Sequence, residues 1–383
     1  MIANDRKYWI ALKSIDGVGS VGFKNLVDAF GHPKNVFNAS LQTLTAVPGI
    51  GPKTAANVKD FNGWHKTEEE LELLKKYDAR LITYQDSLYP RSLLNIYDFP
   101  PSLYSKGLLK EDDVNIAVVG SRMASTYGKF STQRLCRELA INGITVVSGM
   151  ARGIDSAAHK GALAGRGRTI AVLGCGLDTV YPPENQELYE EIVSKGAVIT
   201  EYPFGTPPSG SNFPARNRII SGVSLGVVVV EANEKSGSLI TAKLALEQGR
   251  EVFAVPGSID SAGSRGTHKL IKQGAKLIEN VYDILDEILP QVEMRSKDAP
   301  PEERILRQDN GEEERPEQKT ATHGLTDTEK SILKSISSKA LDIDSIITST
   351  ALKPNEVLNI LLTLELRGII KQLPGKKFMV VKE

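Results

Sequence analysis

The stretch "NIAVVGSRMASTYGKFSTQRLCRELAINGITVVSG", residues 115–149, decides the fold. Two apolar runs, 115–120 and 144–149, have the β-branched composition of buried strands, and the segment 128–143 between them has a helical pattern. Further strand-like runs follow at 169–174, 197–202, 226–232 and 251–257, and further helical stretches at 154–165, 184–196 and 238–249. Strands that are apolar throughout and alternate with helices predict a doubly wound, parallel α/β domain over residues 105–290. Its ligand is expected beyond the carboxyl ends of the strands.

Residues 1–65 precede this domain and are predicted to be helical. The stretches "IDGVGSVGFKNLVDAFG" (15–31) and "VPGIGPKTAANVKDF" (47–61) each place a Gly-apolar-Gly turn before a helix. The pair resembles a tandem helix-hairpin-helix (SAM-like) unit. Backbone N–H groups at such helix starts can meet phosphates, but many such units only pack against their neighbours. Residues 66–104 are interpreted as a connector.

Two further segments follow the α/β domain. Residues 291–322 are rich in charge and proline and are predicted to be a mobile linker. Residues 323–383 predict three helices and a hairpin with its turn at Pro374-Gly375, which indicates a winged helix. The expected recognition helix, 354–367, carries Glu356 and Glu365 and few cations, so a protein-contact or spacer role is favoured over DNA reading.

Composition sets broad limits on the function. The chain has 383 residues, with 47 basic and 47 acidic side chains, which excludes a uniformly basic coat but leaves room for a local basic groove. Cys136 and Cys175 lie far apart and form no metal-binding spacing, so a reducing compartment fits. The charged start "MIANDRKYWI" and the lack of a long apolar run favour a soluble, cytoplasmic protein with no membrane partner.

Glycine- and serine-rich turns follow three of the predicted strands. Glycine permits close backbone approach, and a helix N-terminus favours an anion. With Arg122, Arg152, Arg216 and Arg218 nearby, these turns predict a site for a phosphate-bearing ligand. The residues that the turns contribute are Gly120, Ser121 and Arg122, then Ser148, Gly149, Arg152 and Gly153, and finally Gly237, Ser238 and Thr241.

The segment "NFPARNRIISG", residues 212–222, is interpreted as a loop that enters the next strand. Phe213 can stack a base while Arg216 and Arg218 hold flanking phosphates, which suits a single strand whose base faces are free. In the alternative interpretation, Phe213 fills the domain core and Arg218 binds a nearby carboxylate.

Several other ligands and chemistries are disfavoured by the sequence. No GxGxxG fingerprint and no GxxxxGK[ST] loop occurs, and the five histidines show no ligand spacing, so no cofactor and no metal are expected. Glu201 and Glu231 end strands, and Glu231 beside "SGSLITA" could serve a nucleotide N-glycosidic hydrolase, but no nucleophile–base set accompanies it. His159, four residues after Asp155, is predicted to form a helix-surface pair rather than to act as a base.

The motifs "GSR", "VVSGMARGIDSAAHKGAL", "NFPARNRIISGVS", "SGSLITAKLALEQGREVFAVPG" and "GTHKLIKQGA" together resemble the DNA-processing DprA family, also called Smf. The resemblance covers the α/β domain and implies an extended Rossmann-like fold that binds single-stranded DNA. It further implies a role in natural transformation and recombination, with RecA as a partner, a homodimer through the Rossmann-like domain, and no catalysis.

Carried over by motif, the strand-binding pocket comprises Arg122, the "SGMARGID" loop, the "SGSLITA" turn and Lys269, together with Phe213, Arg216, Asn217 and Arg218. Family members often have a basic residue shortly before the phenylalanine, whereas this chain has the uncharged "PPSGSN". We therefore expect fewer cations at that lip of the pocket. In a further interpretation the chain is mainly an adaptor, whose winged helix and dimer face recruit a partner.

Overall fold

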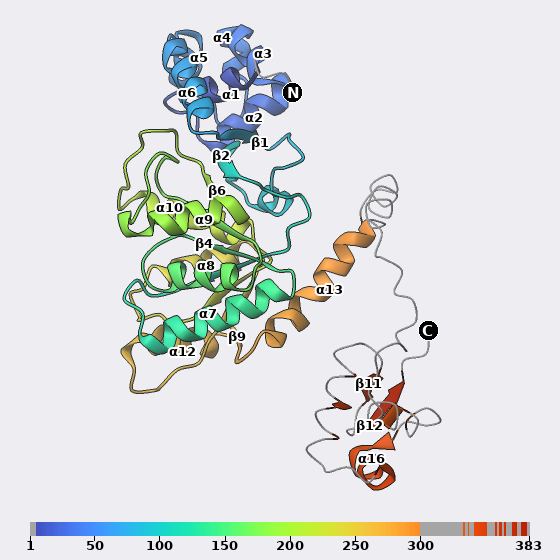
Figure 1. Cartoon of the computed structure of the whole chain (residues 1–383). Coiled ribbons are helices and arrows are strands. Elements are labelled where there is room, and N and C mark those ends of the chain that lie inside the picture. Colours follow the sequence, from blue (N-terminus) through green and yellow to red (C-terminus); the bar gives the residue numbers. More distant parts are fainter. Residues whose placement is uncertain are drawn as a thin grey trace. The chain divides into compact units, whose positions relative to one another are not determined.

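The computed structural model describes residues 5–298 continuously, with the side chains of 291–298 left aside. Beyond them it describes 332, 333, 336, 341–350, 357, 360, 361, 364, 370–373 and 377–380. The chain divides into two compact units, 1–298 and 299–383 (Figure 1).

The first unit begins with six helices, α1 (Arg6–Lys13), α2 (Ser20–Phe30), α3 (Pro33–Asn38), α4 (Leu41–Thr45), α5 (Pro52–Lys59) and α6 (Trp64–Lys76). The two Gly-apolar-Gly turns lead into α2 and α5. Each turn accepts a hydrogen bond from an asparagine side chain of the other hairpin. Asn57 Nδ2 donates to the Asp16 carbonyl oxygen, and Asn25 Nδ2 donates to the Pro48 carbonyl oxygen, both over 3.0 Å. Gly17 has φ +88°, and a Cβ there would lie 2.6 Å from Thr54 Oγ1, so this close approach requires glycine.

A nine-stranded sheet follows, in the order β1-β2-β6-β5-β4-β3-β7-β8-β9. Strands β3 to β9 are all parallel, whereas β2 pairs antiparallel with β6 and β1 antiparallel with β2. The bounds of the strands are β1 Arg80–Thr83, β2 Ser102–Gly107, β3 Asn115–Val119, β4 Thr145–Ser148, β5 Thr169–Val172, β6 Ala197–Thr200, β7 Gly226–Val229, β8 Glu251–Ala254 and β9 Lys276–Leu277.

Helices cover both faces of this sheet (Figure 1). One face buries apolar side chains against α7 (Thr126–Ile141), α8 (Ile154–Ala164), α9 (Gln186–Lys195) and α13 (Tyr282–Asp298). The other face is covered by α10 (Asn212–Gly222), α11 (Ser238–Glu247) and α12 (Arg265–Lys272). The predicted doubly wound α/β class is thereby confirmed.

The direction of the chain reverses between β3 and β7. After β3 the chain adds β4, β5 and β6 on one side, and α10 then carries it back to place β7 on the other side. In open α/β sheets the crevice outside the carboxyl ends of such neighbouring strands is the usual ligand site. The turns after β3 and β7 therefore meet at the same edge of the sheet.

Three expectations are corrected by the structure. Residues 212–222 form helix α10 rather than a loop, because Pro214 lies in the first turn, where its missing N–H costs nothing. Helix α13 continues to Asp298, into the segment predicted as linker, and contains Pro290. His159 is fully buried and lies 2.7 Å from Thr169 Oγ1, so it belongs to the core and not to the helix surface.

The segment 66–104, for which no strand was predicted, contributes β1 and β2 to the sheet as well as helix α6. Short 3-10 turns complete the unit at η2 (Arg91–Asn95), η3 (Pro183–Asn185) and η4 (Ala262–Ser264). None of the helices that the structure describes is long and apolar enough to cross a membrane.

The second unit is described only in part. Strands β10 (Leu341–Asp342), β12 (Lys377–Val380) and β11 (Ile370–Leu373) form a sheet in that order, and α16 spans Ile343–Thr350. The hairpin β11–β12 is present as predicted, although its turn lies outside the described residues, as does most of the predicted linker. Of the predicted recognition helix only four residues are described. All four are helical, and Val357, Leu361 and Leu364 are buried.

Candidate functional site

A cavity of about 650 Å³ opens at the edge of the sheet where β3 and β7 end. Residues from five separate segments line it, as the convergence of the parallel strands predicts. Of the predicted site residues, nine line this cavity: Gly120, Ser121, Arg122, Phe213, Arg216, Asn217, Gly237, Ser238 and Thr241.

An aromatic–cation cluster forms one wall of the cavity. The guanidinium carbon of Arg122 lies 5.2 Å from the centre of the Phe213 ring, within cation–π range. The Phe213 ring is also stacked on Tyr181, with ring centres 5.6 Å apart and an interplanar angle of 29°. Phe213 is half-buried and Arg122 is exposed, so the guanidinium is the more accessible member of the cluster.

The start of helix α11 forms another wall of the cavity. Gly237 is the N-cap residue, and no side chain caps the first N–H groups of the helix. The Ser236 and Ser238 hydroxyls lie 2.8 Å apart beside it, and exposed Lys235 adds a positive charge. The N–H groups of Leu239 and Ile240 donate to the carbonyl oxygens of Ser236 and Gly237, both over 3.1 Å, so the helix dipole and Lys235 are the features that favour a phosphate at this wall.

Arg216 lines the cavity and holds the neighbouring backbone in place. Its side chain is buried, and Nη1 donates to the carbonyl oxygens of Gly149, over 3.1 Å, and of Val172. A Cβ on Gly149 would lie 2.6 Å from Arg216 Nη2 and 2.8 Å from Asp155 Oδ2, so only glycine allows this arrangement. Burial lowers the pKa of Arg216 to about 10, and the charge of Asp155 opposes that shift. Burial likewise raises the pKa of Asp155, against the effect of Arg216.

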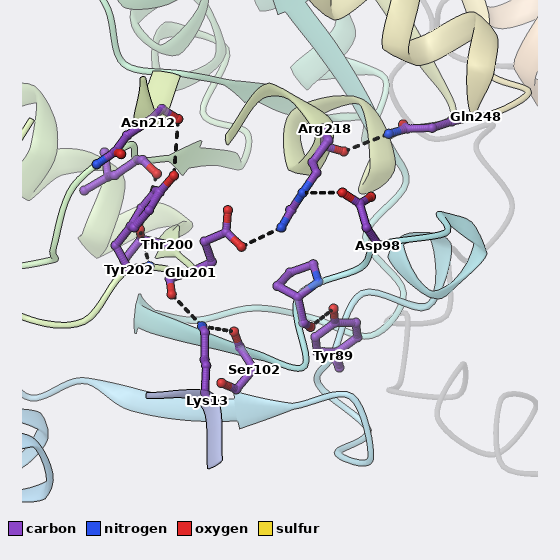
Figure 2. A network of polar contacts seen from close by, with 12 residues as sticks. Lys13, Tyr89, Asp98, Ser102, Thr200, Glu201, Tyr202, Asn212, Arg218 and Gln248 are labelled. Atoms are coloured by element: carbon purple, nitrogen blue, oxygen red, sulfur yellow. Dashed lines mark hydrogen bonds and ion pairs between the residues drawn. The ribbon is translucent and has the colours of Figure 1, made fainter. Parts of the chain in front are cut away.

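Arg218 lies outside the cavity, and its charge is met by internal carboxylates (Figure 2). Its Nη2 lies 2.6 Å from Glu201 Oε2, its Nε lies 3.1 Å from Asp98 Oδ2, and its side chain is only 13% exposed. The alternative interpretation of Arg218 as a partner for a nearby carboxylate therefore describes this structure, and its proposed phosphate contact does not.

The same network reaches helix α1. Lys13 Nζ donates to the carbonyl oxygens of Glu201, over 2.5 Å, and of Ser102, over 3.2 Å (Figure 2). Burial lowers the pKa of Lys13 to about 8, and the negative charge of Glu201 opposes this. The cluster thus connects the N-terminal helices to the strand ends and to α10.

The remaining predicted residues also lie outside the cavity lining. The Ser148 hydroxyl donates to the Val118 carbonyl oxygen over 2.7 Å inside the sheet. Arg152 Nη2 pairs with Glu184 over 3.0 Å. Gly153 precedes α8, whose first N–H donates to the Ser121 carbonyl oxygen over 3.1 Å. Lys269 is exposed on α12.

The carboxylates suit structural roles. Glu231 accepts hydrogen bonds from the Ser125 N–H, over 3.1 Å, and from the Ser125 hydroxyl, over 2.8 Å, at the start of α7. Among the described residues that line the cavity, Asp155 is the only carboxylate, and it is buried beside Arg216. The described residues contain no cluster of metal-ligating side chains.

Among the cavity-lining residues that were not predicted as site residues, Lys235 and Tyr181 have side chains suited to binding a nucleic acid. Lys235 directly precedes the "SGSLITA" turn, and its position before a helix N-terminus was an available signal. Tyr181 has no such signal, because its pairing with Phe213 depends on a loop that is separated from it by a strand and a helix.

Comparison with known proteins agrees with this three-part architecture. The family model described as DNA recombination-mediator protein A matches residues 80–289. A SAM-like helix-hairpin-helix tandem matches 10–61, and a DprA winged helix domain matches 316–376. These matches define a recombination-mediator class of protein. The chain belongs to the DprA family, also called Smf, which confirms the resemblance seen in the sequence.

Relatives extend over most of the chain. It is 36% identical to Protein Smf of Synechocystis sp. over 99% of both chains, and 40% identical to Protein Smf of Escherichia coli over 80% of this chain and 79% of that protein. The X-ray structure of DprA from Streptococcus pneumoniae matches with a TM-score of 0.65 and 38% identity, covering 73% of this chain and 97% of that one. DprA from Helicobacter pylori, whose structure is described for its single-stranded DNA binding mode, matches with a TM-score of 0.50 and 32% identity, covering 55% and 97%.

Proposed function

We propose that this protein binds single-stranded DNA in the cavity between the ends of β3 and β7. The observation that carries the proposal is the Arg122–Phe213 pair, which lines the same cavity as Lys235 and the start of helix α11. An aromatic platform beside phosphate-binding groups suits an unpaired strand, because a duplex conceals its base faces. The described binding mode of the Helicobacter pylori relative supports the same conclusion.

Binding exchanges the partners of Arg122. In the free protein its guanidinium lies over the Phe213 ring. An entering base takes that position on the ring, and the guanidinium moves to a neighbouring phosphate. A second phosphate lies at the start of α11, where the helix dipole and Lys235 attract it. Arg216 contributes by fixing the Gly149 turn and not by direct contact.

The proposed activity is binding without catalysis. Glu231, the one candidate for a hydrolase, is held by Ser125 and does not line the cavity. Glu231→Ala tests the alternative: the proposal expects no release of free base from nucleoside monophosphates by either protein. Release by the unmodified protein that disappears in the variant would favour the hydrolase.

We also propose the wider role that family membership implies. The protein protects incoming single strands during transformation and delivers them to the recombinase RecA, acting as a homodimer through its Rossmann-like domain. Deletion of residues 323–383 separates the parts of this role. We expect strand binding to be retained, and a loss of RecA recruitment alone would assign that function to the winged helix.

A gel-shift comparison of single- and double-stranded oligonucleotides across a salt series tests the central proposal. Arg122→Ala and Lys235→Ala should each weaken single-strand binding. Arg152→Ala is the matched control, because Arg152 is exposed and pairs with Glu184 outside the cavity. Equal affinity for duplex and single strand, or an Arg122→Ala protein that binds normally, would contradict the proposal.

A further inference from the structure

The outer surface of helices α7 and α8 has an unusual composition for this chain. Three apolar side chains at its cavity end are strongly exposed: Met123 is 89%, Phe130 65% and Tyr127 59% exposed. Two of them are aromatic rings within one turn of α7. Large exposed apolar groups that gather in one place mark a binding surface more often than scattered ones do.

The exposed charges on the same two helices are almost all positive. Their exposed basic side chains are Lys129, Arg134, Arg137 and Lys160, whereas Glu138 is the only partly exposed carboxylate. Within the part of the chain that the structure describes, none of these four cations forms an ion pair. The whole chain has zero net charge, so this surface is a local excess of positive charge.

This surface continues directly from the cavity. Arg122 and Met123 line the cavity, and α7 begins at Thr126 on the same edge of the sheet. Helix α7 has 16 residues and lies beside α8 on one face of the sheet (Figure 1). At 1.5 Å per residue it is about 24 Å long, enough for several nucleotides.

We infer that the exposed face of α7 and α8 is a second contact surface for the same DNA strand, which leaves the cavity past Arg122 and Met123. Tyr127 and Phe130 stack bases, and Lys129, Arg134 and Arg137 meet phosphates. Aromatic rings interleaved with unpaired cations favour a single strand over an acidic protein partner, because each ring then has a base to stack on. This inference rests on the proposed function of the cavity.

Oligonucleotide length separates the two sites. A thymidine oligomer of about 5 nucleotides fills the cavity alone, whereas one of about 16 also reaches α7. For the unmodified protein we expect the longer oligomer to bind at least about ten-fold more tightly and with a salt slope steeper by about 2, since three added phosphate contacts each contribute roughly 0.7. Lys129→Glu/Arg134→Glu/Arg137→Glu should remove that gain and leave the short oligomer unaffected.

Matched variants test charge and stacking separately. Lys195→Glu replaces one exposed cation on α9, on the same side of the sheet, just as Lys129→Glu alone does on α7, and it should keep the length effect that Lys129→Glu reduces. Phe130→Leu should reduce binding of the long oligomer, and Phe130→Tyr should retain it. If the α7 variant binds the long oligomer as tightly as the unmodified protein, or weakens both lengths equally, the inference is overturned. Failure of both lengths to bind the unmodified protein would instead refute the proposed function, and the inference with it.

Photocrosslinking of the unmodified protein gives a test that does not depend on the folding of a variant. A long oligomer carrying 5-iodouracil at its end outside the cavity should crosslink to Tyr127 or Phe130, as identified by mass spectrometry. Crosslinks that map only to other helices would overturn the inference. So would an acidic protein that occupies this face while the oligomer remains bound at full affinity.

Discussion

Arg122 and Phe213 come from segments separated by 91 residues of sequence, yet the guanidinium carbon of one lies 5.2 Å from the ring centre of the other. Each residue follows from a different part of the fold, Arg122 from the end of β3 and Phe213 from the first turn of α10. In the free protein the Arg122 guanidinium covers the Phe213 ring, so a base can stack on that ring once the guanidinium moves away.

Replacing Phe213 tests this surface. Phe213→Ala should weaken single-strand binding by about 1–3 kcal/mol, the usual loss when one stacked base is released. Phe213→Tyr keeps a ring in the same place and should bind almost normally. The measurement is fluorescence anisotropy with a short oligomer, alongside a thermal melt to confirm that each variant is folded. Normal binding by Phe213→Ala would show that no base stacks there.

The salt dependence of short-oligomer binding tests the number of cations. Arg122 and Lys235 are the exposed cations of the cavity, because Arg216 is buried beside Asp155. Two phosphate contacts predict a slope of about −1.4 for log affinity against log salt concentration. Each alanine replacement should bring the slope closer to zero by about 0.7. A slope near −3 in the short oligomer would require cations beyond these two.

Removing the charge of Arg218 should affect stability and not DNA binding. Arg218→Met leaves Glu201, which is also only 13% exposed, without its partner, and we expect the free energy of unfolding to fall by about 3 kcal/mol in urea titrations. Arg218→Met/Glu201→Gln should recover part of that loss, since it removes the unpaired charge as well. If Arg218→Met instead reduced DNA affinity and left stability unchanged, Arg218 would belong to the binding site.

The buried His159 predicts a dependence of stability on pH. Burial lowers its pKa to about 3, whereas an unfolded histidine titrates near 6.5. Between these values the unfolded chain binds the proton and the folded chain does not, so stability is full above about pH 6.5 and falls as the pH drops. In that window the slope approaches about 1.4 kcal/mol per pH unit.

Urea titrations at pH 7, 6 and 5 measure this slope, and His159→Gln should flatten it. Asp155, whose pKa burial raises, has the opposite sign: between the unfolded value near 3.9 and its raised folded value, the folded chain holds the proton and the unfolded chain does not, which opposes the effect of His159. Parallel pH profiles for the unmodified and variant proteins would show that another group dominates.

Much of the α/β domain could be predicted from the sequence, because its strands are continuous apolar runs bounded by glycines. Parallel strands also bring their ends to one edge, so the gathering of Gly120, Arg122 and Gly237 followed from topology alone. Strands β1 and β2 could not be predicted in this way. They join the sheet by antiparallel pairing, β1 to β2 and β2 to β6, and β6 is a partner distant in sequence.

The roles of Arg216 and Arg218 could not be decided from the sequence. In a loop, Phe213, Arg216 and Arg218 could all face one ligand. In helix α10, Phe213 and Asn217 share a face because they are four residues apart, and Arg218 points elsewhere. Its partners, Glu201 and Asp98, come from segments whose proximity depends on the complete fold.

The two N-terminal hairpins each supply the bond that closes the other, through Asn57 to Asp16 and Asn25 to Pro48. Each hairpin therefore depends on the other for its stability. A fragment that ends between α2 and α5 loses both of these hydrogen bonds. We therefore expect the two hairpins to unfold together, and a stable proteolytic product or shortened homologue of this region should contain both.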